Sequence, residues 1–173
     1  MAFDFIDGDG VMNNTVVVSD FSTDGTLGTA STSGNVTGTL ISGPVTLTDT
    51  DFFNEFLQEI ALGNSVSFTL NLTENAPSGS PPDSFAFFLL DVVTFLPLFE
   101  TTDPTSAGAL FAVDINGTSS GMLYNFAPTD TGSGVTWIVA PVASVPLPST
   151  ALLIGAGLLG GLAARWRVVQ VAS

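Results

Sequence analysis

An acidic segment near the start of the chain has the residue types of a calcium-binding loop. Asp7-Gly8-Asp9-Gly10 is followed by two asparagines, and carboxylate and amide oxygens are the ligands that Ca²⁺ prefers. In EF-hand register, however, the first and last ligand positions would be Phe5 and Val16, and a turn built on Asp-Gly uses the same residues without a metal. We therefore expect no cofactor. The alternative is a structural Ca²⁺ with Asp7, Asp9, Asn13 and Asn14 as ligands, to which Asp4, Asp49 or Asp51 could be added.

The missing residue types exclude several other kinds of chemistry. The chain has no His, no Cys and no Lys, so histidine-based catalysis, cysteine nucleophiles and Cys/His zinc sites are impossible. All 16 acidic residues lie at or before Asp130, and the two basic residues are Arg165 and Arg167. Residues 1–164 therefore have no cation to displace counterions from phosphates, and we expect no nucleic-acid partner.

Carboxylates alone can hydrolyse a glycosidic bond if two of them flank it. Glu55 and Glu59 are the closest glutamate pair in sequence, but their spacing places both on one surface rather than across a cleft. Tyr124 and Trp137 could form a sugar-binding platform, although aromatic residues at strand spacing are more often core residues. We therefore expect a protein that is not an enzyme, with a small glycoside-active enzyme as one alternative.

The first 140 residues have the pattern of a β-sandwich or jelly-roll domain. The chain is 45% hydrophobic with mean hydropathy +0.50 and contains 14 Phe, so a sizeable core is available without disulfides. Residues 65–73 and 109–115 alternate apolar and polar side chains, while 84–90 are apolar on both faces. Further strands are predicted at 15–19, 36–41, 45–48, 122–126 and 134–139, and the first residues also resemble a strand.

One segment of this domain has a different period. Residues 51–62 place Phe52, Phe53, Phe56, Leu57 and Ile60 on a helical stripe, after Thr50 or Asp51 as N-cap and before Gly63. We predict one short helix here, and a strand that begins near Phe56 is the alternative.

The C-terminal residues are of another kind. Residues 141–150 are a proline-rich linker, and 151–164 are wholly apolar and are followed at once by Arg165-Trp166-Arg167. The 16 uncharged residues from Ser149 to Ala164 would span about 24 Å as a helix, which is short for a bilayer core of about 30 Å. The predicted organisation is a domain at 1–140, a linker at 141–150 and a transmembrane-type helix with its tail at 151–173.

This C-terminal arrangement resembles the PEP-CTERM sorting domain in its Val-Pro-Leu-Pro variant. Val145, Pro146, Leu147 and Pro148 match the motif, an apolar Gly/Leu/Ala helix follows, and Arg165 and Arg167 end it. The resemblance implies that an exosortase-type membrane enzyme recognises and cleaves the proline motif, that residues 151–164 hold the protein in the membrane, and that the arginines stop transfer. The N-terminal domain resembles, more loosely, an uncharacterised family of exported bacterial proteins.

The resemblance implies an exported protein that passes through the inner membrane to the cell surface or an exopolysaccharide matrix. Its expected role is structural or adhesive and non-enzymatic, with a calcium-dependent carbohydrate-binding module as the other alternative. Met1–Gly10 has neither the basic nor the apolar region of a signal peptide, so we expect the true start to lie upstream, the alternative being a cytoplasmic protein.

Overall fold

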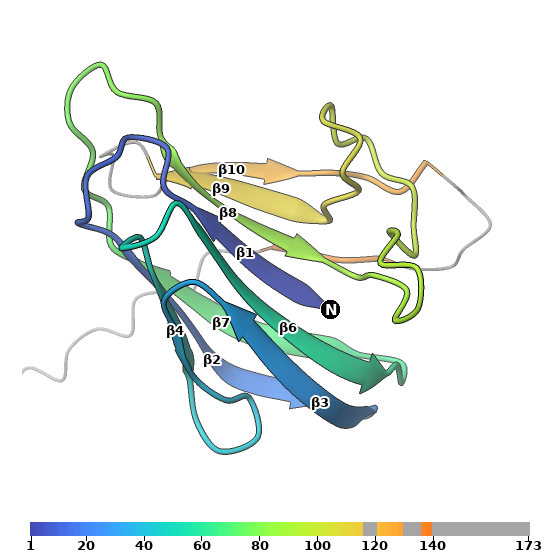
Figure 1. Cartoon of the computed structure of the whole chain (residues 1–173). Coiled ribbons are helices and arrows are strands. Elements are labelled where there is room, and N and C mark those ends of the chain that lie inside the picture. Colours follow the sequence, from blue (N-terminus) through green and yellow to red (C-terminus); the bar gives the residue numbers. More distant parts are fainter. Residues whose placement is uncertain (116–120, 130–135, 140–173) are drawn as a thin grey trace, which may run out of the picture. The chain divides into compact units, whose positions relative to one another are not determined.

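A computed structural model describes residues 1–115, 121–129 and 136–139 of the chain. These residues form a sandwich of two antiparallel sheets, which confirms the predicted mainly-β sandwich (Figure 1). Sheet A has the strand order β10-β9-β8-β1-β6-β3, and sheet B has the order β4-β5-β2-β7. The bounds are β1 Ala2–Ile6, β2 Thr15–Thr23, β3 Thr26–Ser33, β4 Val36–Gly38, β5 Val45–Thr48, β6 Phe53–Ala61, β7 Val66–Leu72, β8 Asp83–Phe88, β9 Phe111–Ile115 and β10 Met122–Asn125.

The predicted helix at 51–62 is wrong, because those residues form β6. Asn54, Phe56 and Gln58 are buried on one face of the strand, while Phe53, Glu55 and Leu57 lie on the other. Apolar side chains on both faces produced a pattern that also fits a helical stripe. Pairing decides between the two, since β6 lies between β1 and β3 and forms ladders with both.

The other strand predictions hold with two differences. Strand β3 was not predicted, because its Ser, Thr and Gly residues are mostly exposed and have no apolar alternation. Of the strand predicted at 134–139, only Thr136–Val139 are described, and they belong to no strand. Trp137 and Val139 nevertheless pack against the core as half-buried side chains.

Six phenylalanines of sheet A and one of sheet B form the centre of the core. The Phe3 ring lies at its middle, with centroid distances of 5.2 Å to Phe87, 6.2 Å to Phe85 and 6.3 Å to Phe56. Phe68 of β7 meets Phe3 edge to face at 5.1 Å, so this contact joins the two sheets. Val16, Val18, Val45 and Leu47 supply the fully buried side chains of sheet B.

Replacing Phe3 by alanine should destabilise the domain strongly. Its side chain is fully buried and contacts rings from both sheets, so Phe3→Ala should lower the free energy of unfolding by about 3–5 kcal/mol. Phe52→Ala is the matched control, because Phe52 is 73% exposed and its loss should change that free energy by about 0.5 kcal/mol or less. Urea denaturation of both variants measures this, and equal effects would contradict the core described here.

Candidate functional site

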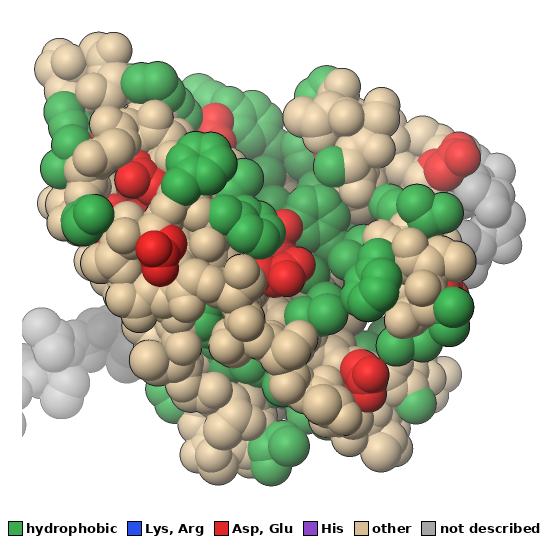
Figure 2. Space-filling model, in the orientation of Figure 1, with side chains coloured by type: hydrophobic (Ala, Val, Ile, Leu, Met, Phe, Trp, Pro, Cys, Tyr) green, Lys and Arg blue, Asp and Glu red, His purple; other side chains and the backbone are tan. Residues whose placement is uncertain are grey.

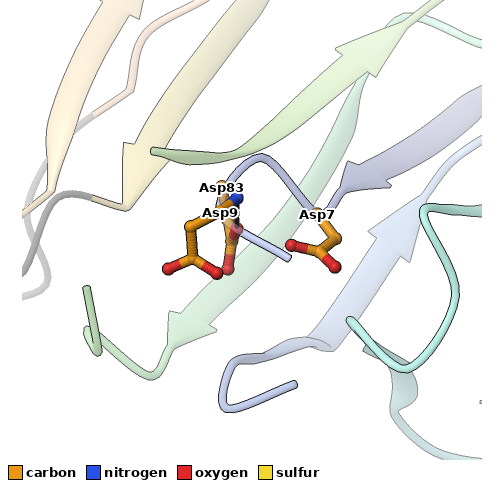
Figure 3. A group of neighbouring side chains, drawn as sticks. All are labelled: Asp7, Asp9 and Asp83. Atoms are coloured by element: carbon orange, nitrogen blue, oxygen red, sulfur yellow. Dashed lines mark hydrogen bonds between the residues drawn. The ribbon is translucent and has the colours of Figure 1, made fainter. Parts of the chain in front are cut away.

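Three carboxylates meet at one end of sheet A. Asp7 and Asp9 lie in the loop after β1, and Asp83 is the first residue of β8 (Figure 3). One oxygen atom from each side chain lies within 4.8 Å of the others. The loop after β1 and the loop before β8 run side by side at this end of the sandwich (Figure 1), so the ladder between β1 and β8 brings together residues that are 76 and 74 positions apart.

Asp83 organises this end of the sheet. Its side chain is 1% exposed, and its Oδ1 accepts hydrogen bonds from the backbone N–H groups of Gly8, at 2.8 Å, and Asp9, at 3.4 Å. A Cβ atom at Gly8 would lie 1.9 Å from the carbonyl oxygen of Pro82, so only glycine allows this approach. The buried carboxylate thus fixes the loop that carries the other two acids.

The predicted ligands have different places in this arrangement. Asp7 and Asp9 are brought together, and each also closes its own turn, by accepting hydrogen bonds from the N–H groups of Gly10 at 2.6 Å and Val11 at 2.7 Å. Asn14 is buried, and its Nδ2 donates to Asp83 Oδ2 at 2.7 Å. Because its Oδ1 also accepts from Thr73 and Asn75, the Asn14 amide is fully used within the protein.

Two oxygen atoms in this region lack a hydrogen-bond partner. They are Oδ2 of Asp9 and Oδ1 of Asn13, and both atoms are buried. A buried acceptor without a partner is costly, and a bound cation or water commonly supplies what is missing. The Ca²⁺ prediction remains a prediction, but its chemistry fits the oxygen atoms present at this end of the sheet.

The other acids named from the sequence are placed elsewhere. Asp49 is buried and its Oδ2 accepts from the N–H groups of Asn13 and Asn14, at 2.9 and 2.6 Å, so it holds the loop. Asp51 is exposed in the turn before β6. Sequence reasoning missed Asp83 as a site residue. The signal that could have found it is its place directly before the strand predicted at 84–90.

A second pair of acids, Asp4 and Glu55, lies on the outer face of sheet A. They are directly opposite each other in the β1–β6 ladder, and Ala86 of β8 is on the other side of Asp4. Burial, and then the negative charge of Glu55, raise the pKa of Asp4 to about 7. Its Oδ1 is buried without a partner. Asp4 therefore holds a proton at a pH where most carboxyl groups have lost theirs.

The remaining candidates for sugar chemistry do not form one site. Glu55 and Glu59 lie four residues apart on the same face of β6, about 13 Å along the strand. Tyr124 pairs with Ala112 on the outer face of sheet A, whereas its neighbour Asn125 accepts a hydrogen bond at 2.8 Å from Trp137, which packs against the core. The two aromatic rings are thus on different faces of the sheet.

Comparison with known proteins identifies the C-terminal segment. Residues 144–168 match the PEP-CTERM protein-sorting motif. This segment includes Val145–Pro148, the apolar residues and both arginines, so the chain carries that sorting motif, as the sequence resemblance predicted. The motif implies an exported protein that is anchored in the membrane and processed by an exosortase.

The N-terminal domain has no such assignment. No curated protein and no solved structure matches the chain. The predicted helix at 151–164 and the linker at 141–150 lie outside the described residues. In the part of the chain that the structure describes, no helix has the length and apolar character needed to cross a bilayer.

The raised pKa of Asp4 predicts how stability depends on pH. Between about pH 4 and pH 7 the folded protein keeps a proton that the unfolded chain releases, so this group lowers the free energy of unfolding as pH rises through that window. Asp4→Asn removes the effect and should raise the free energy of unfolding at pH 8 by about 1–3 kcal/mol, with little change at pH 4.

Denaturation curves at both pH values measure this difference. Asp20→Asn is the control, because Asp20 is exposed and should show no such pH-dependent gain. An Asp4→Asn protein with the same stability profile as the native chain would contradict the assignment.

Proposed function

We propose that this is an exported, non-enzymatic protein of the cell surface or the exopolysaccharide matrix, cleaved by an exosortase within Val145–Ser149. The observation that carries the proposal is the sorting-motif match at residues 144–168. In this proposal the apolar residues 151–164 hold the precursor in the membrane, and Arg165 and Arg167 stop its transfer.

The extent of the folded domain supports cleavage at this place. The last strand of the described residues ends at Asn125, and the last described core contacts are those of Trp137 and Val139. A cut after Ser144 would therefore remove none of the ten described strands and none of the described core. The released product would keep its β-sandwich and would lose both basic residues of the chain.

The charge of this domain supports the proposal of a structural or adhesive role. All 16 acidic residues precede the proposed cleavage point, so the product would carry them without a single Lys, Arg or His. Asp49 and Asp83 accept hydrogen bonds from backbone N–H groups and hold loops. Such a surface repels anionic polymers unless divalent cations intervene, and it suits association with neutral polysaccharide or cationic groups.

Cleavage can be tested by intact-mass analysis of the protein from its native host. We expect a C-terminus between Val145 and Ser149, and we expect Pro146→Ala or Pro148→Ala to leave the 173-residue chain uncut. Pro141→Ala is the matched control, because this proline lies outside residues 144–168 and should not affect processing. A mature native protein that still carries Arg165 and Arg167 would refute the cleavage proposal.

A second candidate function, a calcium-dependent adhesion or carbohydrate-binding module, is favoured by one observation. Three carboxylates converge at the end of sheet A, and the buried Asp9 Oδ2 and Asn13 Oδ1 atoms nearby lack partners. We propose Asp7, Asp9 and Asp83 as the ligands of a structural Ca²⁺, which would neutralise the cluster and stiffen the loop after β1.

This site predicts a cation-specific gain in stability. If the dissociation constant is about 10⁻⁴–10⁻³ M, 10 mM Ca²⁺ should raise the melting temperature by about 3–8 °C, and chelator should reverse the rise. Asp9→Asn should abolish it, because the amide keeps the turn bond to Val11 but loses the charge. Asp20→Asn should retain it, and an equal rise with NaCl at matched ionic strength would show that only screening occurs.

A further inference from the structure

The end of sheet A opposite the acidic cluster contains a cavity of about 270 Å³. It lies where β1 begins and where β6 and β8 end, beside the loop that follows β8. Its lining is mostly apolar and includes Leu57, Ile60, Leu89 and Phe95. In Figure 2 hydrophobic side chains gather over this part of the molecule, on the right of the view, with an acidic side chain beside them.

The loop at residues 91–98 has a defined conformation that its own hydrogen bonds maintain. Asp91 Oδ1 accepts from the N–H groups of Val93 and Thr94, at 3.0 and 2.8 Å, and from Thr94 Oγ1 at 2.9 Å. The Asp91 N–H donates to the carbonyl of Leu96 at 2.8 Å, which closes the loop. These bonds, the Thr94 N–H first, hold the pKa of Asp91 below its usual range, so its carboxylate stays ionised.

The loop that contains Gly108 packs against the 91–98 loop. Gly108, with φ of +75°, lies so close to Pro97 that a Cβ atom would be 2.4 Å from the proline Cγ. Pro97 also forms a bridge with Leu90, and the Leu98 N–H donates to the carbonyl of Leu89 at 2.8 Å. The loop is thus a preformed surface.

This preformed loop displays large apolar side chains to solvent. Val92, Phe95 and Leu98, which line the cavity, are 60%, 58% and 42% exposed, and the adjacent Val93 is 81% exposed. Phe95 also has φ of +56°, a left-handed conformation that is unfavourable for a bulky side chain. An ordered, strained and exposed aromatic residue adds little to the stability of its own domain, and such features are typical of binding surfaces.

The charges around the cavity indicate what can bind there. Glu59 and Asp91 line it, as does Met1, whose α-ammonium donates to the carbonyl of Gln58 at 2.9 Å. Residues 1–164 contain no basic side chain, so the two carboxylates leave the lining net anionic. A second copy of the domain would bring the same negative charge, and an anionic lipid surface would be repelled as well. The size of the cavity suits one or two large side chains, being below the usual volume of a drug-sized ligand site.

We propose that the cavity and the 91–98 loop dock a basic, apolar peptide segment of a partner protein. Its Leu- or Phe-type side chains enter the cavity against Phe95 and Leu57, while its Lys or Arg pairs with Glu59 and Asp91. The acidic residues supply orientation and the apolar lining supplies the buried area. This docking surface does not depend on the cleavage at 145–149 or on calcium at the acidic cluster.

Fluorescence anisotropy with three labelled hexapeptides tests the proposal on the full-length chain. Gly-Lys-Leu-Leu-Lys-Gly should bind saturably, whereas the versions with Glu for Lys or Ser for Leu should bind at least about tenfold more weakly. Raising NaCl from 0.05 to 0.5 M should weaken binding of the basic peptide, because part of the attraction is electrostatic. Equal binding of all three peptides, or no binding, would overturn the proposal.

Substitutions distinguish a binding residue from a structural one. Phe95→Asn should raise the melting temperature, because asparagine tolerates positive φ, and should still weaken peptide binding by about tenfold or more. The Thr29 N–H donates to Glu59 Oε2 at 3.1 Å, and Glu59→Gln keeps an acceptor for this bond. This variant should selectively weaken binding of the basic peptide. Ile41→Ser is the control, because Ile41 is 72% exposed and lies outside the cavity lining. This variant should bind the peptide like the native chain.

Other occupants of the surface would be recognised in the same variants. If the basic peptide does not bind, the proposal is overturned. Self-association in sedimentation that Phe95→Asn abolishes would then identify a second copy as the occupant, and binding to phosphatidylcholine vesicles that Phe95→Asn weakens would identify a membrane. Native-like peptide binding by Phe95→Asn would overturn the proposal as well.

Discussion

The ring of Phe3 is the contact on which the rest of this domain depends. It packs against three phenylalanines of sheet A and meets Phe68 of sheet B edge to face, so it joins the two layers. The domain has no disulfide, and with no basic residue before Arg165 its carboxylates have no cationic side chain to pair with. Apolar packing between the sheets therefore supplies most of the cohesion, and β1 runs from the cavity at one end of sheet A to the acidic cluster at the other.

The absence of basic residues before Arg165 also explains how this domain uses its acids. Asp24, Asp49, Asp83, Asp91 and Asp103 each accept hydrogen bonds from backbone N–H groups and thereby fix a loop. Neutral donors replace the ion pairs that most domains would use. The exceptions are informative: Asp4 keeps a proton, and Asp9 has a buried oxygen without a partner.

Sequence patterns predicted the parts of the fold whose two faces differ or whose turns are explicit. The alternation at 65–73 and 109–115 indicated strands, and the structure has strands at Val66–Leu72 and Phe111–Ile115. The helix predicted at 51–62 was wrong because the central strand β6 has apolar side chains on both of its faces, a pattern that a helix also produces. Strand β3 was missed because an edge strand of Ser and Thr has little apolar pattern. In both cases the neighbouring strands, rather than the local residues, determine the conformation.

The sequence by itself determined the sorting motif of this protein, which implies export, and the sign of its charge. The sorting motif at 144–168 is contiguous, so its proline motif, apolar run and arginines can be recognised without a fold. The convergence of Asp83 with Asp7 and Asp9 was decided only by the tertiary structure, since these residues meet through the β1–β8 ladder. The raised pKa of Asp4 and the strained, exposed Phe95 likewise depend on burial, register and backbone angle, which strand pairing and packing set.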